Sequence, residues 1–455
     1  MRAKRFTLRP VTKVLAIALI VAMAASLVSA AAGSKAKKPA EPASSPGTMQ
    51  LYPSKYYLIH SDLPAEDVKE AVIRMNHMAE EYHARTQGFS GDIREKLPFY
   101  LFRTPVEYYE AGGLPGTAGV FMQRGDSSKL MAIAGDQTNG TTWHVVQHEG
   151  FHQFAHAVIR GELPPWVNEG IAEYFGESLF TGDGFVTGVI PPSRLKRVQA
   201  EIAGNRLKSV KDMMLTSHEQ WNMEMQIENY DQAWSMVHFL AQGENGRYQD
   251  AFVNFMKLIG KGVEWPAAWK QTFGDAVGFE QKWKDYWINQ PKNPTSNLYV
   301  QAITATFTSF VARAATQKQT FDNFDEFVRE AKAGNVKTGQ TVDDWLPPKL
   351  LQDALAASEH APAKWTLAHT PSKATELVAV LEDDTRMVGT FTVSGARLSK
   401  VGVEVDDTGA ALKQAQALIA EGKKDQARTL LQHALKNHPR SPLAEDARKL
   451  IIQAK

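Results

Sequence analysis

The sequence predicts an α+β protein made of a small α/β lobe, a mostly helical lobe and C-terminal appendages. Short apolar runs alternate with one long amphipathic stretch between Tyr56 and Asp136, and helical periodicity dominates from Trp143 to about Gln290. A period of two returns between Thr375 and Val405 before a last helical stretch. With 455 residues, the chain is longer than a single hydrophobic core usually supports, so several domains are expected.

The first thirty residues are typical of a secretory signal peptide. A basic stretch precedes the apolar run from Val14 to Ala25, and Val28-Ser29-Ala30 offers small residues for cleavage. The alternative is an uncleaved anchor that ends near Ala32, although this run is barely long enough to span a bilayer. We therefore expect a signal peptide over 1–30, a flexible linker over 31–50, and an exported body that is periplasmic or extracellular.

The two lobes of the body are expected over residues 51–140 and 141–295. In the first, a helix over Ala65–Thr86 lies among short strands, which are Tyr57–Ile59, Phe99–Phe102, Val120–Met122 and Leu130–Ile133. In the second, a helix from Trp143 to Arg160 ends at Gly161, and the fixed φ of Pro165 suits the start of the next helix. More helices rich in Trp and Phe follow.

Three appendages follow the segment Pro291–Pro294. They are a helical extension over 296–360, a small β unit over 361–406 and a helical hairpin over 407–455. In the hairpin, the spacing of its small residues and proline resembles one tetratricopeptide repeat; these residues are Gly422, Ala427, Ala434 and Pro439. A single repeat cannot bury its own face, so the hairpin packs on the rest of the chain or binds a protein partner.

The composition excludes nucleic-acid binding and any role for cysteine. The formal net charge of +1 gives no basic field for nucleic acid, so no nucleic-acid partner is expected. The chain has no cysteine, which excludes disulfides and thiolate ligands. Any metal ion must therefore be held by histidines and carboxylates.

The chemically informative motif is His148-Glu149-Gly150-Phe151-His152 in the first helix of the second lobe. A separation of four residues places both imidazoles on one helix face, with Cβ atoms roughly 6 Å apart, where they can share a metal ion. Glu149 lies one position round the helix. Its carboxylate can face a water at the metal without being a ligand, as a general base requires.

Carboxylates on the next helix complete the candidate metal site. A catalytic zinc ion takes three protein ligands and keeps one open position, and Glu169 follows His152 after sixteen intervening residues. A short connection and an antiparallel return helix would bring Glu169 beside the histidines. Glu173 lies one turn further on, where it can accept the other ring N–H of a ligand histidine and fix its orientation.

The two helices together resemble the gluzincin metallopeptidases, in which H-E-x-x-H is followed by a glutamate in a context like Trp166-Val167-Asn168-Glu169-Gly170. The match is closer still to a secreted bacterial family of unknown function in the same clan, over about Tyr56 to Trp287. The resemblance implies a zincin-like core that binds one Zn²⁺ through His148, His152 and Glu169.

An edge strand is implied by the same resemblance. Aminopeptidases of this type carry a Gly-x-Met-Glu-Asn strand before the motif, and Gly119-Val120-Phe121-Met122 lies at the corresponding distance here. Gly119, Val120 and Phe121 would present backbone groups to an extended peptide. Gln123 replaces the glutamate that holds a substrate's terminal amine, which favours an endopeptidase over an aminopeptidase.

Tyr230 is the remaining catalytic candidate. The segment Tyr230-Asp231-Gln232-Ala233 resembles one in which a tyrosine donates a hydrogen bond to the oxyanion of the reaction. The alternative is a tyrosine at a helix start that packs beside Trp234 with its hydroxyl group in water.

The resulting hypothesis is an exported zinc hydrolase, a peptidase that acts on a peptide or protein, with Glu149 as general base and Tyr230 as oxyanion donor. One alternative is a catalytically inactive zincin scaffold that binds partners through its C-terminal modules. Another is hydrolysis of a non-peptide amide or a cell-wall cross-link. His144 and His156 continue the four-residue ladder, but no glutamate directly follows either histidine, so both are expected not to be ligands.

Overall fold

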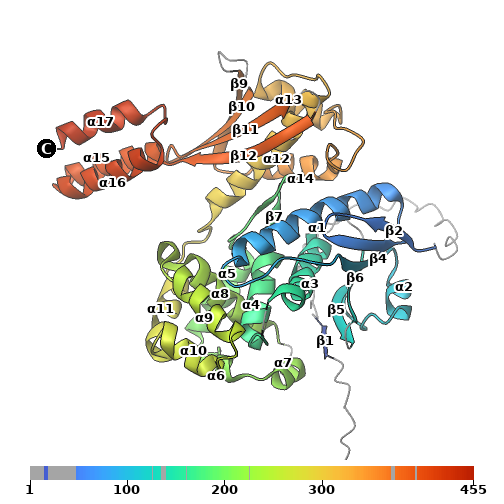
Figure 1. Ribbon diagram of the computed structural model, residues 1–455. Helices are drawn as coiled ribbons and strands as arrows, with labels where there is room; N and C mark the ends of the chain where they lie inside the picture. The colour runs from blue at the N-terminus through green and yellow to red at the C-terminus, as the bar shows by residue number, and fades with distance from the viewer. Residues whose placement is uncertain are drawn as a thin grey trace, which may run out of the picture. The chain divides into compact units, whose positions relative to one another are not determined.

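The computed structural model describes residues 15–18, 48–124, 127–134, 140–159, 161–224, 226–369, 375–394 and 397–454. The chain has an α+β fold and divides into two compact units (Figure 1). Unit 1 comprises Met1–Glu177 and Pro191–Lys292, and unit 2 comprises Ser178–Ile190 and Asn293–Lys455. Apart from Leu15–Ala18 and Thr48–Gln50, the predicted signal peptide and linker lie outside the described residues.

Unit 1 contains a six-stranded mixed sheet with the strand order β1-β5-β6-β4-β3-β2. Its β3–β4 and β4–β6 pairs are parallel, and the other pairs are antiparallel. The helix α1 (Ala65–Thr86) connects β3 to β4 and buries an apolar stripe that includes Val68, Val72, Met75 and Ala79. The strands are β1 (Leu15–Ala18), β2 (Gln50–Pro53), β3 (Tyr57–Ser61), β4 (Leu97–Phe102), β5 (Gly119–Arg124) and β6 (Ser127–Ile133).

The helices of unit 1 pack around the pair formed by the third and fourth helices. Gly170 permits close packing of α4 on α8, because a Cβ atom there would lie 2.5 Å from the carbonyl oxygen of Ala233. Trp166 is fully buried against Phe255 and Trp269. The helices are α2 (Pro105–Glu110), α3 (Gly140–Val158), α4 (Pro165–Gly176), α5 (Pro192–Ala203), α6 (Val210–Leu215), α7 (His218–Glu224), α8 (Ile227–Gly246), α9 (Gln249–Gly260), α10 (Trp265–Thr272) and α11 (Ala276–Ile288).

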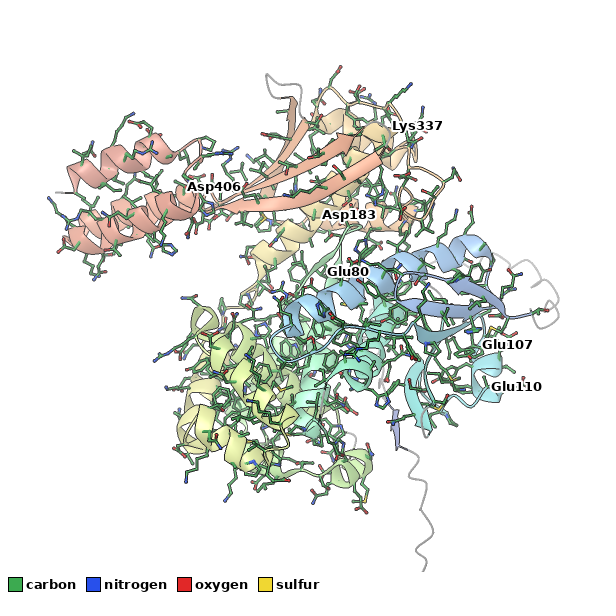
Figure 2. The ribbon with its side chains drawn as sticks, in the orientation of Figure 1. Glu80, Glu107, Glu110, Asp183, Lys337 and Asp406 are labelled. Carbon is green, nitrogen blue, oxygen red and sulfur yellow. The ribbon has the colours of Figure 1, made fainter. Side chains whose placement is uncertain are left out.

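Unit 2 begins with a short β-hairpin, formed by β7 and β8, which lies in the sequence between α4 and α5. This hairpin is held to α12 by Asp183, labelled in Figure 2, which accepts two hydrogen bonds of 2.8 and 2.9 Å from the guanidinium of Arg313. The antiparallel sheet β12-β11-β10-β9 packs on α12. The elements are β7 (Leu179–Phe180), β8 (Phe185–Val186), α12 (Ser296–Thr316), α13 (Phe324–Lys332), α14 (Pro348–Ser358), β9 (Ala363–His369), β10 (Thr375–Leu381), β11 (Arg386–Ser394) and β12 (Arg397–Asp406).

The last three helices of unit 2 have a small core of their own. Ala427, Leu431 and Ala434 are buried among them, and Gly422 takes a φ of +78° in the turn between the first two. The glycine and alanines therefore serve the turn and the packing that their spacing predicts. The helices are α15 (Thr408–Ala420), α16 (Lys424–Asn437) and α17 (Ala444–Gln453).

Most of the predicted elements form, with two differences. The helix Ala65–Thr86 has the predicted bounds, and the four predicted strands of the first lobe are β3 to β6. The strand β9 lies within the β unit predicted over 361–406, ahead of the stretch in which period two was predicted. The apolar segment Leu15–Ala18 forms β1 and pairs with β5, so β5 is not the edge of this sheet. Within the described parts of the chain, we find no helix whose length and apolar character would let it cross a membrane.

Replacement of Gly170 by alanine is expected to destabilise unit 1. The added methyl group clashes with the backbone of α8, which cannot move aside as a side chain can by changing its rotamer. The free energy of unfolding should therefore fall by about 1–3 kcal/mol. Urea denaturation followed by circular dichroism measures the change. Gly184→Ala is the control, because no atom lies within 4 Å of its added Cβ; equal stability of the two variants would contradict the packing argument.

Candidate metal centre

The helix α3 carries the histidine ladder and is fixed from two sides. The hydroxyl of Tyr82 in α1 donates a hydrogen bond to the carbonyl of Gln147. The side-chain amide of Gln147 donates to the carbonyls of Phe175 and Gly176 at the end of α4, at 3.0 and 3.1 Å. These bonds set both the position of α3 and its register against α4.

Three ligand atoms converge between α3 and α4. The Nε2 atoms of His148 and His152 are 3.1 Å apart, and Glu169 Oε2 lies 3.3 Å from the first and 3.4 Å from the second. Ligand atoms around a tetrahedral metal ion at about 2.0–2.2 Å would be roughly 3.3–3.6 Å apart. The two distances to Glu169 lie within this range and the distance between the imidazoles, 3.1 Å, lies just below it, so the three atoms are close enough to share one metal ion.

Burial of the three ligands supports the same assignment. His148, His152 and Glu169 are at most 3% exposed. Within the described part of the chain, Glu169 Oε2 finds no donor with hydrogen-bond geometry. An ionised oxygen without a hydrogen bond in the interior is costly unless a cation compensates it. The sequence predicted these three residues as metal ligands, and the structure brings them together.

The charges around His148 favour a cation at this point. Burial alone would lower the pKa of His148, but the neighbouring Glu169 and Glu173 outweigh burial and raise its pKa to about 10. Burial alone would raise the pKa of Glu169, but the positive charges of His152 and His148, whose Nε2 atoms lie 3.4 and 3.3 Å from its Oε2, lower it to about 2. The raised pKa of His148 reflects the negative charge of the two carboxylates around it, and the lowered pKa of Glu169 keeps this group ionised, the form in which it can bind a metal ion.

Glu149 lies beside the three ligands without joining them. Its Oε2 accepts a hydrogen bond of 2.7 Å from the backbone N–H of Phe121 in β5. Its Oε1 is buried and makes no hydrogen bond among the described residues. Burial raises the pKa of Glu149 above the usual value for a glutamate, which increases its affinity for a proton. One oxygen is thus anchored, and the other can exchange a proton.

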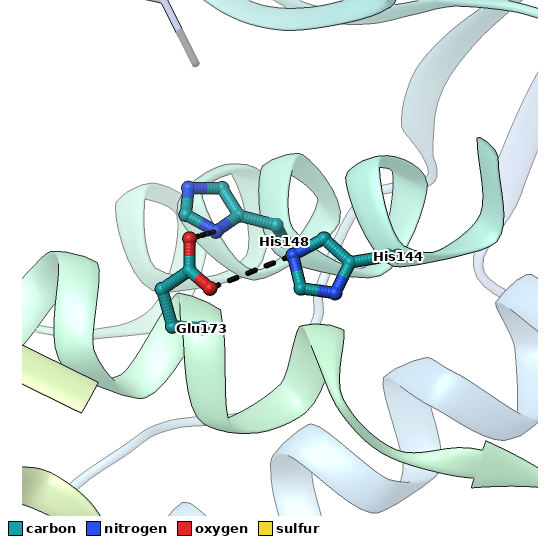
Figure 3. A group of neighbouring side chains, drawn as sticks. All are labelled: His144, His148 and Glu173. Atoms are coloured by element: carbon teal, nitrogen blue, oxygen red, sulfur yellow. Dashed lines mark ion pairs between the residues drawn. The ribbon is translucent and has the colours of Figure 1, made fainter. Parts of the chain in front are cut away.

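Glu173 joins two histidines of the ladder (Figure 3). Its Oε1 lies 3.3 Å from His148 Nδ1, and its Oε2 lies 3.5 Å from His144 Nε2. The first distance agrees with the predicted role of Glu173 as the partner of a ligand histidine.

His144, His148 and Glu173 form a second group that could hold a metal ion. However, Glu173 Oε2 already pairs with Arg194 Nη2 at 2.6 Å. A second cation bound there would be repelled by the guanidinium. Of the two groups, the one that contains His152 and Glu169 is therefore the better candidate for holding a metal ion.

Tyr230 is close to this centre. It lies in the first turn of α8, 6% exposed, with its ring centroid 6.4 Å from that of His148 and 5.3 Å from that of Trp221. Burial and the negative charge of Glu169 raise the pKa of Tyr230, so the hydroxyl keeps its proton and can donate it in a hydrogen bond. Its ring packs on Trp221, whereas the alternative interpretation of the sequence had it beside Trp234 in water.

The predicted edge-strand residues differ in what they do. A Cβ atom at Gly119 would lie 2.6 Å from Val145 of α3, so glycine there allows the sheet to approach the helix. Phe121 holds Glu149 through its N–H. The prediction of an open edge is wrong for this structure, because Val120 and Phe121 pair with Ala18 and Ile17. The reason is general: an unpaired edge accepts any available extended segment.

A cavity of about 280 Å³ adjoins the ligand His152 within unit 1. Burial lowers the pKa of His156, so this lining imidazole is neutral at pH 7. His218 Nε2 lies 3.3 Å from Glu162 Oε1 on the same wall. Sequence analysis did not identify Glu162 or His218, since neither stands in a motif. The lining comprises Phe121, Gln123, His152, Ala155, His156, Ile159, Gly161, Glu162, Leu163, Asn168 and His218.

One protein-family model matches part of the chain. Residues 143–261 match the model of a family described as "Protein of unknown function (DUF1570)". The matched segment is about a quarter of the chain and contains the three ligands, Glu149 and Tyr230. No curated protein matches the sequence.

The metal assignment predicts the behaviour of ligand variants. The purified chain should retain about one metal ion after dialysis, and His152→Ala and Glu169→Ala should lose it, because two donors do not hold a labile ion against dialysis. Elemental analysis of the dialysed proteins measures the content. His144→Ala is the control and should keep the ion; loss of metal from this variant alone would move the site to the group that contains Glu173.

Proposed function

We propose that the protein is an exported zinc-dependent hydrolase that cleaves amide bonds, and that it is a peptidase. The observation that carries the proposal is the position of Glu149, which is anchored through one oxygen and free at the other, beside three convergent ligand atoms. A purely structural metal site has no use for such a carboxylate. Two imidazoles and one carboxylate, with a fourth position left open, are the donor set of catalytic zinc sites.

Each residue then has one task. A zinc ion bound here would polarise the substrate carbonyl and acidify the attacking water. Glu149 Oε1 accepts the proton of that water as its oxygen attacks the carbonyl carbon, and it then passes the proton to the leaving nitrogen. Tyr230 donates its hydroxyl hydrogen to the carbonyl oxygen as negative charge develops there. Glu173 lies next to the other ring nitrogen of His148, where it would accept the Nδ1 hydrogen once Nε2 holds the metal ion.

The proposed substrate is an extended peptide, cleaved internally. Removal of residues 1–30 as a signal peptide would leave the outer side of β5 unpaired, so that a peptide could take the place of β1. The strand carries the amide of Gln123 at the cavity, and an amide does not neutralise the terminal amine of a substrate. This favours an endopeptidase over an aminopeptidase.

The role of Glu149 is tested by Glu149→Gln. The glutamine cannot take a proton but preserves the shape of the side chain, so turnover should fall by about 10²–10⁴-fold while zinc content stays at one. The assay uses a quenched fluorescent peptide library blocked at the amino terminus, with elemental analysis of the same samples. Wild-type turnover in the variant would refute the mechanism. Cleavage only of peptides with a free amino terminus would refute the endopeptidase assignment.

Tyr230→Phe tests the oxyanion donor. Loss of one hydrogen bond made only as charge develops should lower kcat by about 10²–10³-fold with little change in KM. Steady-state kinetics on the best library peptide separates the two constants. Trp221→Phe, which alters the packing beside Tyr230 but not its hydroxyl, is the comparison. An equal loss in both variants would assign Tyr230 a packing role.

A further inference from the structure

We propose that Arg194 is a positioning residue of the metal centre. It fixes the carboxylate of Glu173, which lies next to His148, and the helix turn that carries Tyr230. The inference rests on the proposed function. Arg194 is 5% exposed and uses three nitrogens on three carboxylates. Nη2 lies 2.6 Å from Glu173 Oε2, Nη1 lies 2.6 Å from Glu177 Oε1, and Nε lies 2.7 Å from Asp231 Oδ1.

One arm of this arrangement reaches the metal ligands through Glu173. The guanidinium holds Oε2 of Glu173, which leaves Oε1 at 3.3 Å from His148 Nδ1. With Oε2 held by the guanidinium, the carboxylate cannot turn away, so Oε1 stays beside His148 Nδ1 and limits the orientation of the ring, although this pair lacks hydrogen-bond geometry.

The other arm reaches Tyr230 through the adjacent residue. Asp231 is 2% exposed and receives Arg194 Nε together with Arg197 Nε, the latter at 2.6 Å. These bonds tie the first turn of α8 to α5. The guanidinium carbon also lies 4.8 Å from the ring centroid of Trp234, one turn further along α8. The position of Tyr230 relative to His148 thus depends on the same cation.

Arg194 also connects the two parts of unit 1 that the segment Ser178–Ile190 separates in the sequence. Glu173 and Glu177 end α4 just before the chain leaves unit 1 at Ser178, and Arg194 is in the first turn of α5, just after the chain returns. The ion pairs with Glu173 and Glu177 therefore join the two ends of the excursion inside unit 1. They hold the end of α4, the helix that carries Glu169, against the start of α5.

The test compares Arg194→Lys with wild type and with Arg206→Lys, whose exposed ion pair with Glu201 is remote from these contacts. Lysine keeps the charge but cannot contact three carboxylates in the plane of a guanidinium. Zinc affinity, measured by competition with a chromogenic chelator, should fall about 10-fold in Arg194→Lys and stay unchanged in Arg206→Lys. On the peptide library, kcat should fall about 10-fold with KM unchanged.

Two further measurements separate positioning from folding. Circular dichroism establishes the folded fraction, to which zinc affinity is referred. The double variant Arg194→Lys, Glu173→Gln should bind zinc only slightly more weakly than Arg194→Lys alone, because both substitutions act on the same contact. If the losses of zinc affinity of the two single variants add up in the double variant, the inference is overturned. Wild-type zinc affinity and kcat in folded Arg194→Lys would also overturn it. A wild-type chain that binds zinc but cleaves nothing would instead refute the proposed function, and the affinity comparison would still decide the role of Arg194.

Discussion

Compensation of buried carboxylates is the constraint on which the rest of unit 1 depends. Glu149, Glu169, Glu173 and Asp231 are all at most 3% exposed, and an ionised carboxylate in the interior costs several kcal/mol unless an opposite charge or hydrogen-bond donors surround it. The chain meets this requirement with Arg194 on one side and the two ligand imidazoles on the other. The helices that carry these groups have to be buried and close together, which explains the tight contact of α4 with α8 at Gly170.

Three of these carboxylates have different surroundings, and each is therefore suited to a different chemical role. Glu173 contacts a guanidinium and stays ionised, so it acts as a fixed acceptor. Glu169 faces both imidazoles with an oxygen that has no hydrogen bond, which suits a ligand. Glu149 accepts one backbone hydrogen bond and forms no ion pair among the described residues, and burial raises its pKa, which suits a group that takes and returns a proton. The division of roles follows from the neighbours of each side chain.

The sequence predicted what depends on local spacing and missed what depends on the tertiary fold. His148, His152 and Glu149 could be placed because helical periodicity fixes their relative directions, and Glu169 because only a short connection separates the two helices. Arg194 could not, since its partners lie on α4 and α8 and the chain leaves the unit between them. The open edge at Val120 and Phe121 was mispredicted for the same reason: pairing with Leu15–Ala18 spans about a hundred residues of sequence. The α+β class followed from periodicity alone.

The family match contains the candidate metal ligands but not the backbone group that anchors Glu149. Residues 143–261 contain the three ligands together with Glu173, Arg194 and Asp231, so the donor set and its charge compensation lie in one continuous segment. The backbone donor that anchors Glu149 does not, because Phe121 belongs to β5. A related chain could therefore share the segment 143–261 and its candidate metal ligands. In that chain a different strand could orient the residue at the position of Glu149, or no strand could do so. Whether such a chain hydrolyses a substrate then depends on the sheet that packs against α3, and the sequence of the matched segment alone cannot determine it.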